Sequence, residues 1–145
     1  MRVMAIVKGD APPGEELPPA EMFEAMGRFN ERLAEAGVMV DGAGLLPSSE
    51  GKRIAYEDGE TRVIDGPFAE TKDLVAGFWL LRVDSLDEAI EWMKQAPFGG
   101  GFQLELRPLG EDDAFDEVFT DEMRATRDRT ASLIRRNVAS VHADV

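Results

Sequence analysis

The chain has 145 residues, of which 43% are hydrophobic and 31% are charged, and its net charge at pH 7 is −13. This length suits one domain with an adequate core, and the composition excludes a disordered chain and a coiled coil. The acidic balance disfavours nucleic acid and anionic lipid as partners, and without cysteine and with a single histidine, His142, no metal site is expected.

The N-terminal third predicts a strand, a helix and a second strand. Residues 1–8 form a short apolar run rich in β-branched residues, which is typical of a strand. A helix buried on one face should follow and end at Gly37, because apolar residues recur at three- and four-residue spacings. These residues are Met22, Met26, Phe29, Leu33 and Ala36. Residues 38–46 predict a second strand, in which Gly42 and Gly44 indicate a bulge or a close backbone approach.

A β-hairpin is predicted next. Asp58-Gly59 is the two-residue signal for a type I′ turn, and it joins residues 52–57 to residues 60–64. Pairing in that register defines two faces. One face carries Ile54, Tyr56, Thr61 and Val63, and the other carries Arg53, Ala55 and Arg62.

The second half of the domain repeats the strand–helix–strand pattern. In residues 74–83, apolar side chains occupy both faces of the predicted strand, which is typical of a strand covered on both sides. Asp84-Ser85 should cap a helix that ends near Pro97, and its apolar stripe consists of Leu86, Ala89, Ile90 and Met93. Residues 102–107 alternate apolar and polar side chains before Pro108, which predicts a half-exposed strand.

This order predicts an α+β fold, a ferredoxin-like βαββαβ core with an inserted hairpin over residues 1–109. Right-handed crossovers put both helices on one face of the antiparallel sheet, so the other, apolar face needs a partner. We expect a homodimer through these sheet faces. Residues 110–145 form a separate C-terminal helical arm, with seven acids and no base at 111–122 and then five arginines and one acid at 124–136. We expect this arm to pack on the domain or on its dimer partner.

One segment resembles a known family. Asp65-Gly-Pro-Phe-Ala-Glu-Thr-Lys72 is similar to the recurring stretch of the DGPF, or YCII-related, domain family, and the similarity continues through Gly77-Phe78-Trp79 and Glu105-Leu-Arg-Pro108. The resemblance spans roughly residues 1–109 and implies a dimeric α/β barrel of two four-stranded sheets packed face to face. One branch of the family carries a histidine early in its first helix, which is thought to form a His-Asp pair. The corresponding region here, Met22–Met26, has no histidine.

The family-like segment also holds the densest group of candidate catalytic residues. Asp65, Glu70 and Lys72 are possible acid–base groups, and Phe68 and Thr71 are candidate ligand contacts. The structural alternative is that Asp65 caps the turn, that Phe68 anchors the loop, and that residues 70–72 begin a helical turn or pair across the dimer.

A second candidate site combines two strand faces. Glu105 and Arg107 share one side of their strand with Gln103, and residues 2, 4, 6 and 8 share one side of the first strand. If these sides adjoin, they form a partly polar cavity for a small anion or a polar aromatic molecule, with Phe78 or Trp79 as its apolar wall. Alternatively, Glu105 and Arg107 form salt bridges to the partner subunit.

The sequence therefore predicts a dimeric protein that binds a small polar or aromatic molecule, and it leaves open whether the protein is an enzyme. As a lyase or isomerase without cofactor or metal, it would use Glu70 or Asp65 as base and Arg107 or Lys72 to hold an anion. The alternative is an accessory or regulatory protein that contacts another protein, such as a sigma factor, through surfaces that include the arm. No segment is apolar enough for a membrane span or a signal peptide, so we expect a cytoplasmic location.

Overall fold

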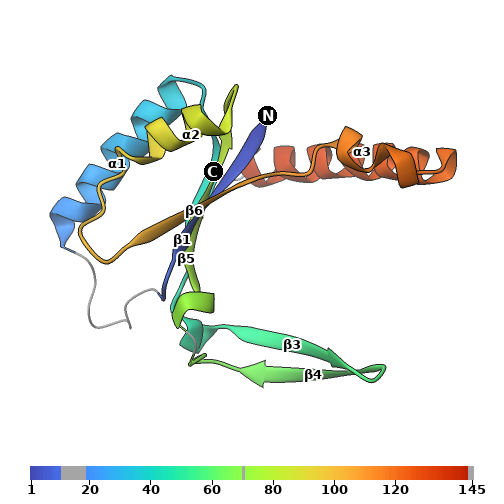
Figure 1. Cartoon of the computed structure of the whole chain (residues 1–145), viewed down its shortest axis with the longest axis horizontal. Coiled ribbons are helices and arrows are strands. Elements are labelled where there is room, and N and C mark those ends of the chain that lie inside the picture. Colours follow the sequence, from blue (N-terminus) through green and yellow to red (C-terminus); the bar gives the residue numbers. More distant parts are fainter. Residues whose placement is uncertain (11–18, 70, 144–145) are drawn as a thin grey trace. The chain divides into compact units, whose positions relative to one another are not determined.

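The computed structural model describes residues 1–10, 19–69 and 71–143, without the side chains of residues 71, 112, 113 and 141–143 (Figure 1). The chain divides into two compact units, Met1–Leu109 and Gly110–Val145. Within the described residues, no helix combines the length and the apolar composition that crossing a bilayer requires.

The first unit is built on a four-stranded antiparallel sheet with the strand order β2-β5-β1-β6. The strands are β1 (Arg2–Lys8), β2 (Met39–Gly44), β5 (Val75–Arg82) and β6 (Gln103–Pro108). The helices α1 (Ala20–Glu35) and α2 (Leu86–Met93) both lie on one face of this sheet (Figure 1). This arrangement confirms the predicted α+β, ferredoxin-like fold.

Local signals explain where the helices begin and end. Ser85 caps α2, because its side chain accepts a hydrogen bond from the Glu88 N–H. Gly37 follows α1 with φ +72°, and the N–H groups of Gly37 and Val38 donate to the carbonyl oxygens of Ala34 and Leu33. This pattern is the Schellman motif, which favours glycine at that position, as predicted.

The core lies between the two helices and the sheet. On β1 the residues Val3, Ala5 and Val7 are buried, whereas Met4 and Ile6 between them are only half-buried. The buried cluster consists of Val3, Ala5, Val7, Phe29, Leu33, Val38, Trp79, Leu81, Val83, Ala89 and Met93. The alternation on β1 shows that one face of the sheet is fully covered and the other is not.

The glycine-rich strand β2 has the close backbone approach that was one of the two alternatives for its glycines, and it has a bulge just before them. Its pairing with β5 shifts register between Met39 and Asp41, which is a bulge. A Cβ atom at Gly42 would lie 3.0 Å from the Phe78 carbonyl oxygen, so the backbones approach closely there. The bulge and the close approach explain the interrupted apolar pattern of this strand.

The predicted hairpin forms a two-stranded sheet of its own from β3 (Lys52–Glu57) and β4 (Glu60–Asp65). Ile54 pairs with Val63 as expected, and Asp58 and Gly59 both have positive φ, as a type I′ turn requires. The apolar face of the hairpin is open to solvent, with Ile54, Tyr56 and Val63 more than half exposed.

The second unit consists of a 3-10 segment, η3 (Asp112–Val118), and one long helix, α3 (Asp121–Ala143). The sequence predicted one or two helices in this region. No described side chain of α3 is buried.

Candidate functional site

The family-like segment lies at the base of the hairpin, where it is held by backbone contacts. Asp65 ends β4, and its carboxylate lies 2.5 Å from the Lys52 ammonium group, with both side chains largely exposed. The Gly66 N–H donates to the Gly51 carbonyl oxygen at 3.0 Å. A Cβ atom at Gly66 would lie only 1.8 Å from the Ser48 carbonyl oxygen, so only glycine fits this position.

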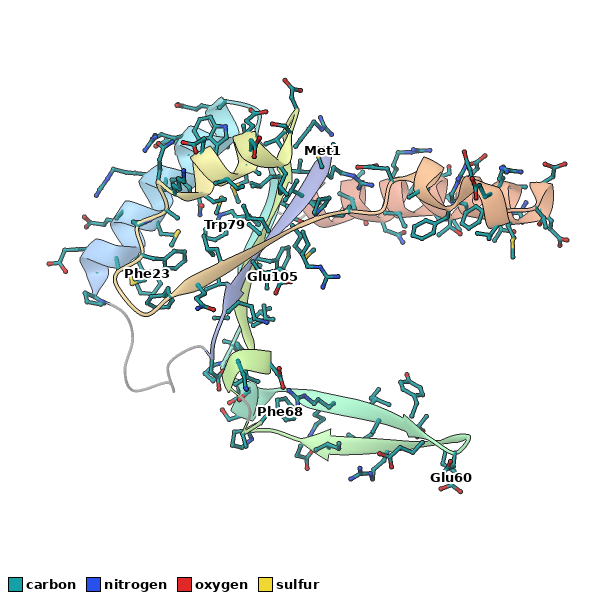
Figure 2. All side chains as sticks on the ribbon, in the orientation of Figure 1. Met1, Phe23, Glu60, Phe68, Trp79 and Glu105 are labelled. Atoms are coloured by element: carbon teal, nitrogen blue, oxygen red, sulfur yellow. The ribbon has the colours of Figure 1, made fainter. Side chains whose placement is uncertain are left out.

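Phe68 holds the loop against the 3-10 turn η1 (Ser48–Glu50) and the hairpin (Figure 2). Its N–H donates to the Ser48 hydroxyl oxygen at 3.3 Å, and the Arg53 guanidinium group lies 4.0 Å above the ring centroid. Ser48 in turn donates to the Asp10 carboxylate from its hydroxyl group at 2.6 Å and from its N–H at 2.8 Å. The loop is therefore tied to the end of β1 as well as to the hairpin.

An open groove of about 570 Å³ lies beside these contacts. Apolar side chains from the end of β2 and the start of β5 form most of its wall, and Arg53, Phe68 and Ser48 form one side. The described lining residues are Asp10, Gly44, Leu45, Leu46, Pro47, Ser48, Glu50, Gly51, Arg53, Phe68, Leu74 and Val75. Asp65 is not among the described residues that line the groove, and its carboxylate is paired with Lys52.

Of the other two candidate acid–base residues, only Lys72 is among the described residues, and no described contact joins it to Asp65. Lys72 is exposed in the short 3-10 turn η2 (Thr71–Asp73). Glu70 lies outside the described residues, as does the side chain of Thr71. Among the described residues, no three acidic or histidine side chains are close enough to hold a metal ion.

The second candidate site is the sheet face that α1 and α2 leave uncovered, which we call the open face. The strand register places Phe78, Ile6 and Glu105 side by side across β5, β1 and β6. The next row contains Leu80, Met4 and Arg107. The side chains of β1 and β6 that were considered together from the sequence are therefore neighbours in the sheet.

The open face has an apolar centre with charged residues around it. The Glu105 carboxylate lies between two cations, 3.8 Å from the Lys8 ammonium nitrogen and 3.7 Å from the Arg107 Nε. Arg2 and Arg82 are cross-strand partners at the end of the face next to Met4. On β1, β5 and β6 this face thus carries four bases and one acid, in a chain whose net charge is −13.

Trp79 lies on the opposite face, between the sheet and α1 (Figure 2). It is 5% exposed, packs edge-on against Phe29 and Phe98, and donates its indole N–H to Asn30 Oδ1 at 2.8 Å. Of the two predicted aromatic walls, only Phe78 faces the open side, and Trp79 belongs to the core.

Three contacts of the loop were not predicted from the sequence: Arg53 with Phe68, Phe68 with Ser48, and Ser48 with Asp10. Arg53 was assigned only to a hairpin face, and Asp10 and Ser48 were assigned no role. Asp10 and Ser48 are 38 residues apart, and no spacing pattern links them. The glycine and phenylalanine of the family-like segment were the only local signal that this loop packs tightly.

Comparisons with known proteins identify the family of the first unit. A family model described as the YCII-related domain matches residues 1–108. An uncharacterised protein of Rhizobium meliloti (strain 1021) is 39% identical over 82 residues, which cover 54% of this chain and 64% of that relative. The arm from Gly110 onward lies outside the family match. The chain belongs to the YCII-related domain family.

Proposed function

We propose that the protein is a homodimer whose open faces pack together as an α/β barrel and bind a small anionic molecule with an aromatic or other apolar part. The observation that carries this proposal is the open face itself, an apolar centre flanked by four bases and one acid on β1, β5 and β6, with Asp41 of β2 as a second acid beside Leu80. The proposal concerns binding. A lyase or isomerase without a cofactor would use the same cations to hold its substrate.

The dimer is supported by the apolar centre of the open face. Met4, Ile6, Phe78 and Leu80 are half-buried, and they lie on the face of the sheet opposite to the core residues of β1 and β5. Apolar surface removed from water contributes about 25 cal/mol per Å². A two-fold axis lets each copy cover the other with the same patch, which is how most homodimers form.

The ligand class is supported by the charges around that centre. Glu105 is paired with Lys8 and Arg107, and yet the Arg107 side chain keeps 71% of its surface exposed. A guanidinium group binds carboxylates through two parallel hydrogen bonds. An anion that carries an aromatic ring can therefore contact Arg107 with one end and Phe78 with the other.

The dimer is tested by light scattering coupled to gel filtration. Phe78→Arg puts a charge in the centre of the open face and should weaken the dimer, so that the folded variant dissociates at a higher protein concentration than the wild type. The matched control is Val63→Arg, at a half-exposed apolar position of the hairpin, which should stay dimeric. A monomeric wild type, or a monomeric Val63→Arg beside a dimeric Phe78→Arg, would contradict the proposal.

The ligand class is tested by calorimetric titration with benzoate, and with benzamide as its neutral analogue. We expect benzoate to bind and benzamide to bind at least tenfold more weakly, because the cations recognise the carboxylate. Arg107→Ala should abolish benzoate binding, whereas Arg62→Ala on the hairpin should leave it unchanged. Equal binding of the two probes, or no binding of either at millimolar concentration, would contradict an anion site.

The exposed hairpin face favours a second candidate, an accessory protein that contacts another protein. Ile54, Tyr56 and Val63 form an apolar strip that the described residues of the chain leave open. For a sigma factor as partner, reversing the charges of Arg124, Arg127 and Arg129 should abolish the contact measured with the purified partner. Benzoate binding should then be unchanged, and the opposite pattern would exclude this candidate.

A further inference from the structure

The helix α3 presents an apolar stripe that the structure leaves exposed. Met123, Leu133, Ile134 and Val138 are each between 49 and 54% exposed. Helices in water depend mainly on the packing of an apolar face for their stability. Within its own unit, a helix of 23 residues without a buried described side chain therefore needs another surface to pack on.

The stripe runs along one side of the helix. Met123, Ile134 and Val138 share this face, on which they are separated by three- and four-residue steps through Arg127 and Thr130, and Leu133 lies beside it. The face is therefore apolar towards its two ends and polar in the middle. Charged residues flank this face on both sides. The arm therefore has the pattern of a helix that packs along its length against one other helix.

The charges of the arm change sign along its length. Residues 111–122 carry seven acids and no base, and residues 124–136 carry five arginines and one acid. Arg124 pairs with Asp116 and Asp121 at 3.9 and 3.3 Å. For Arg135 and Arg136, the described contacts include no ion pair, so the basic end of α3 is available for an external acidic partner.

We propose that the α3 helices of two copies pack against each other in antiparallel orientation, centred between Asp128 and Arg129. In this register the acidic first turn of each helix lies level with the basic end of the other. Asp121 of one helix then lies level with Arg136 of the other, and Glu122 lies level with Arg135 of the other. Met123 lies level with Ile134, so the apolar stripes coincide where the charges match.

The charge order selects both the occupant and the orientation. In a parallel pair, every acid would lie level with an acid and every arginine with an arginine, which is repulsive. In an antiparallel pair, opposite charges meet at both ends, and the apolar stripe supplies the buried surface. Because the arm is acidic at its beginning and basic further on, its charges are complementary to those of a second copy in antiparallel orientation.

The absence of cysteine makes a direct test possible in the full-length protein. In the antiparallel register, the two copies of residue 130 are offset by about 4.5 Å along the axis, and those of residue 138 by about 28 Å. Under mild oxidation, Thr130→Cys should give a disulfide-linked dimer, and Val138→Cys should not. Cross-linking at 138 equal to that at 130 would overturn the orientation, and no cross-linking at either position would overturn the pairing.

Complementary charge variants test whether the partner is a second copy. In the Thr130→Cys background, Asp121→Lys with Glu122→Lys, and separately Arg135→Glu with Arg136→Glu, should each lower cross-linking at least fivefold. A mixture of the two variants should restore it, because one arm is then basic and the other acidic. A mixture that stays as low as each variant alone would overturn the proposal. Paired α3 helices would by themselves join two copies, so Phe78→Arg is also measured in the Arg135→Glu, Arg136→Glu background. Loss of the dimer there reports the sheet interface alone, and either proposal can fail without the other.

Discussion

Gly66 illustrates how a single residue maintains the loop at the base of the hairpin. Gly66→Ala should lower the free energy of unfolding by about 1–3 kcal/mol, because the added methyl group would overlap the Ser48 carbonyl oxygen. The control is Gly27→Ala in α1, where no atom lies within 4 Å of the added group. This variant should stabilise the protein by up to about 1 kcal/mol, because alanine favours a helix. Urea denaturation followed by circular dichroism measures both, and equal changes would contradict the close contact.

The hydrogen bond between Trp79 and Asn30 is the second feature at the scale of a residue. Asn30→Ala leaves the buried indole N–H without its acceptor, so we expect a loss of about 1–3 kcal/mol in the free energy of unfolding. Asn30→Asp keeps an acceptor and should restore most of that loss. Thermal unfolding measures the difference, and an Asn30→Ala protein as stable as wild type would show that the bond contributes nothing.

At the scale of an element, α2 depends on its N-terminal cap. The Ser85 hydroxyl oxygen accepts from the Glu88 N–H at 3.1 Å, and the Glu88 carboxylate accepts from the Asp84 N–H at 2.7 Å. Ser85→Ala should therefore cost about 1 kcal/mol of stability. Ser49→Ala is the control, since no described hydrogen bond involves its hydroxyl group. Chemical denaturation that shows equal stability for both variants would contradict the role of the cap.

The hairpin is the least supported element of the first unit. A single two-stranded sheet is at best marginally stable in water, and β3 and β4 add no residue to the buried core. Its attachment rests on the loop of Gly66 and Phe68, because the exposed pair of Lys52 and Asp65 joins β3 to β4 within the hairpin itself.

At the scale of the whole molecule, the open face determines which ligand can approach. Glu105 is its only acid on β1, β5 and β6, and it offsets part of the charge of Lys8 and Arg107. Glu105→Gln should increase benzoate affinity about fivefold, since a unit charge a few ångströms away contributes about 1 kcal/mol in water. Titration calorimetry measures this change, with Glu57→Gln on the hairpin as control. Unchanged or weaker binding would show that benzoate does not bind beside Glu105.

The sequence by itself determined the elements of the first unit and their caps. Apolar residues that recur every two positions indicate a strand, and those that recur every 3.6 positions indicate a helix, so the strands and both helices of the first unit could be predicted. The Asp58-Gly59 turn and the role of Gly37 could be predicted from the residue types alone. The family-like segment at Asp65–Lys72 identified the family for the same reason, because it is contiguous along the chain.

Only the tertiary structure decided which faces are covered and which distant residues meet. Alternation put Phe78 and Trp79 on opposite sides of β5, but the docking of α1 and α2 determines which side is the core. The contacts of Asp10 with Ser48 and of Arg53 with Phe68 likewise join segments that share no periodic pattern. Periodicity is a property of neighbouring residues, whereas burial depends on how separate elements pack, and this is why the candidate site could be predicted only in part.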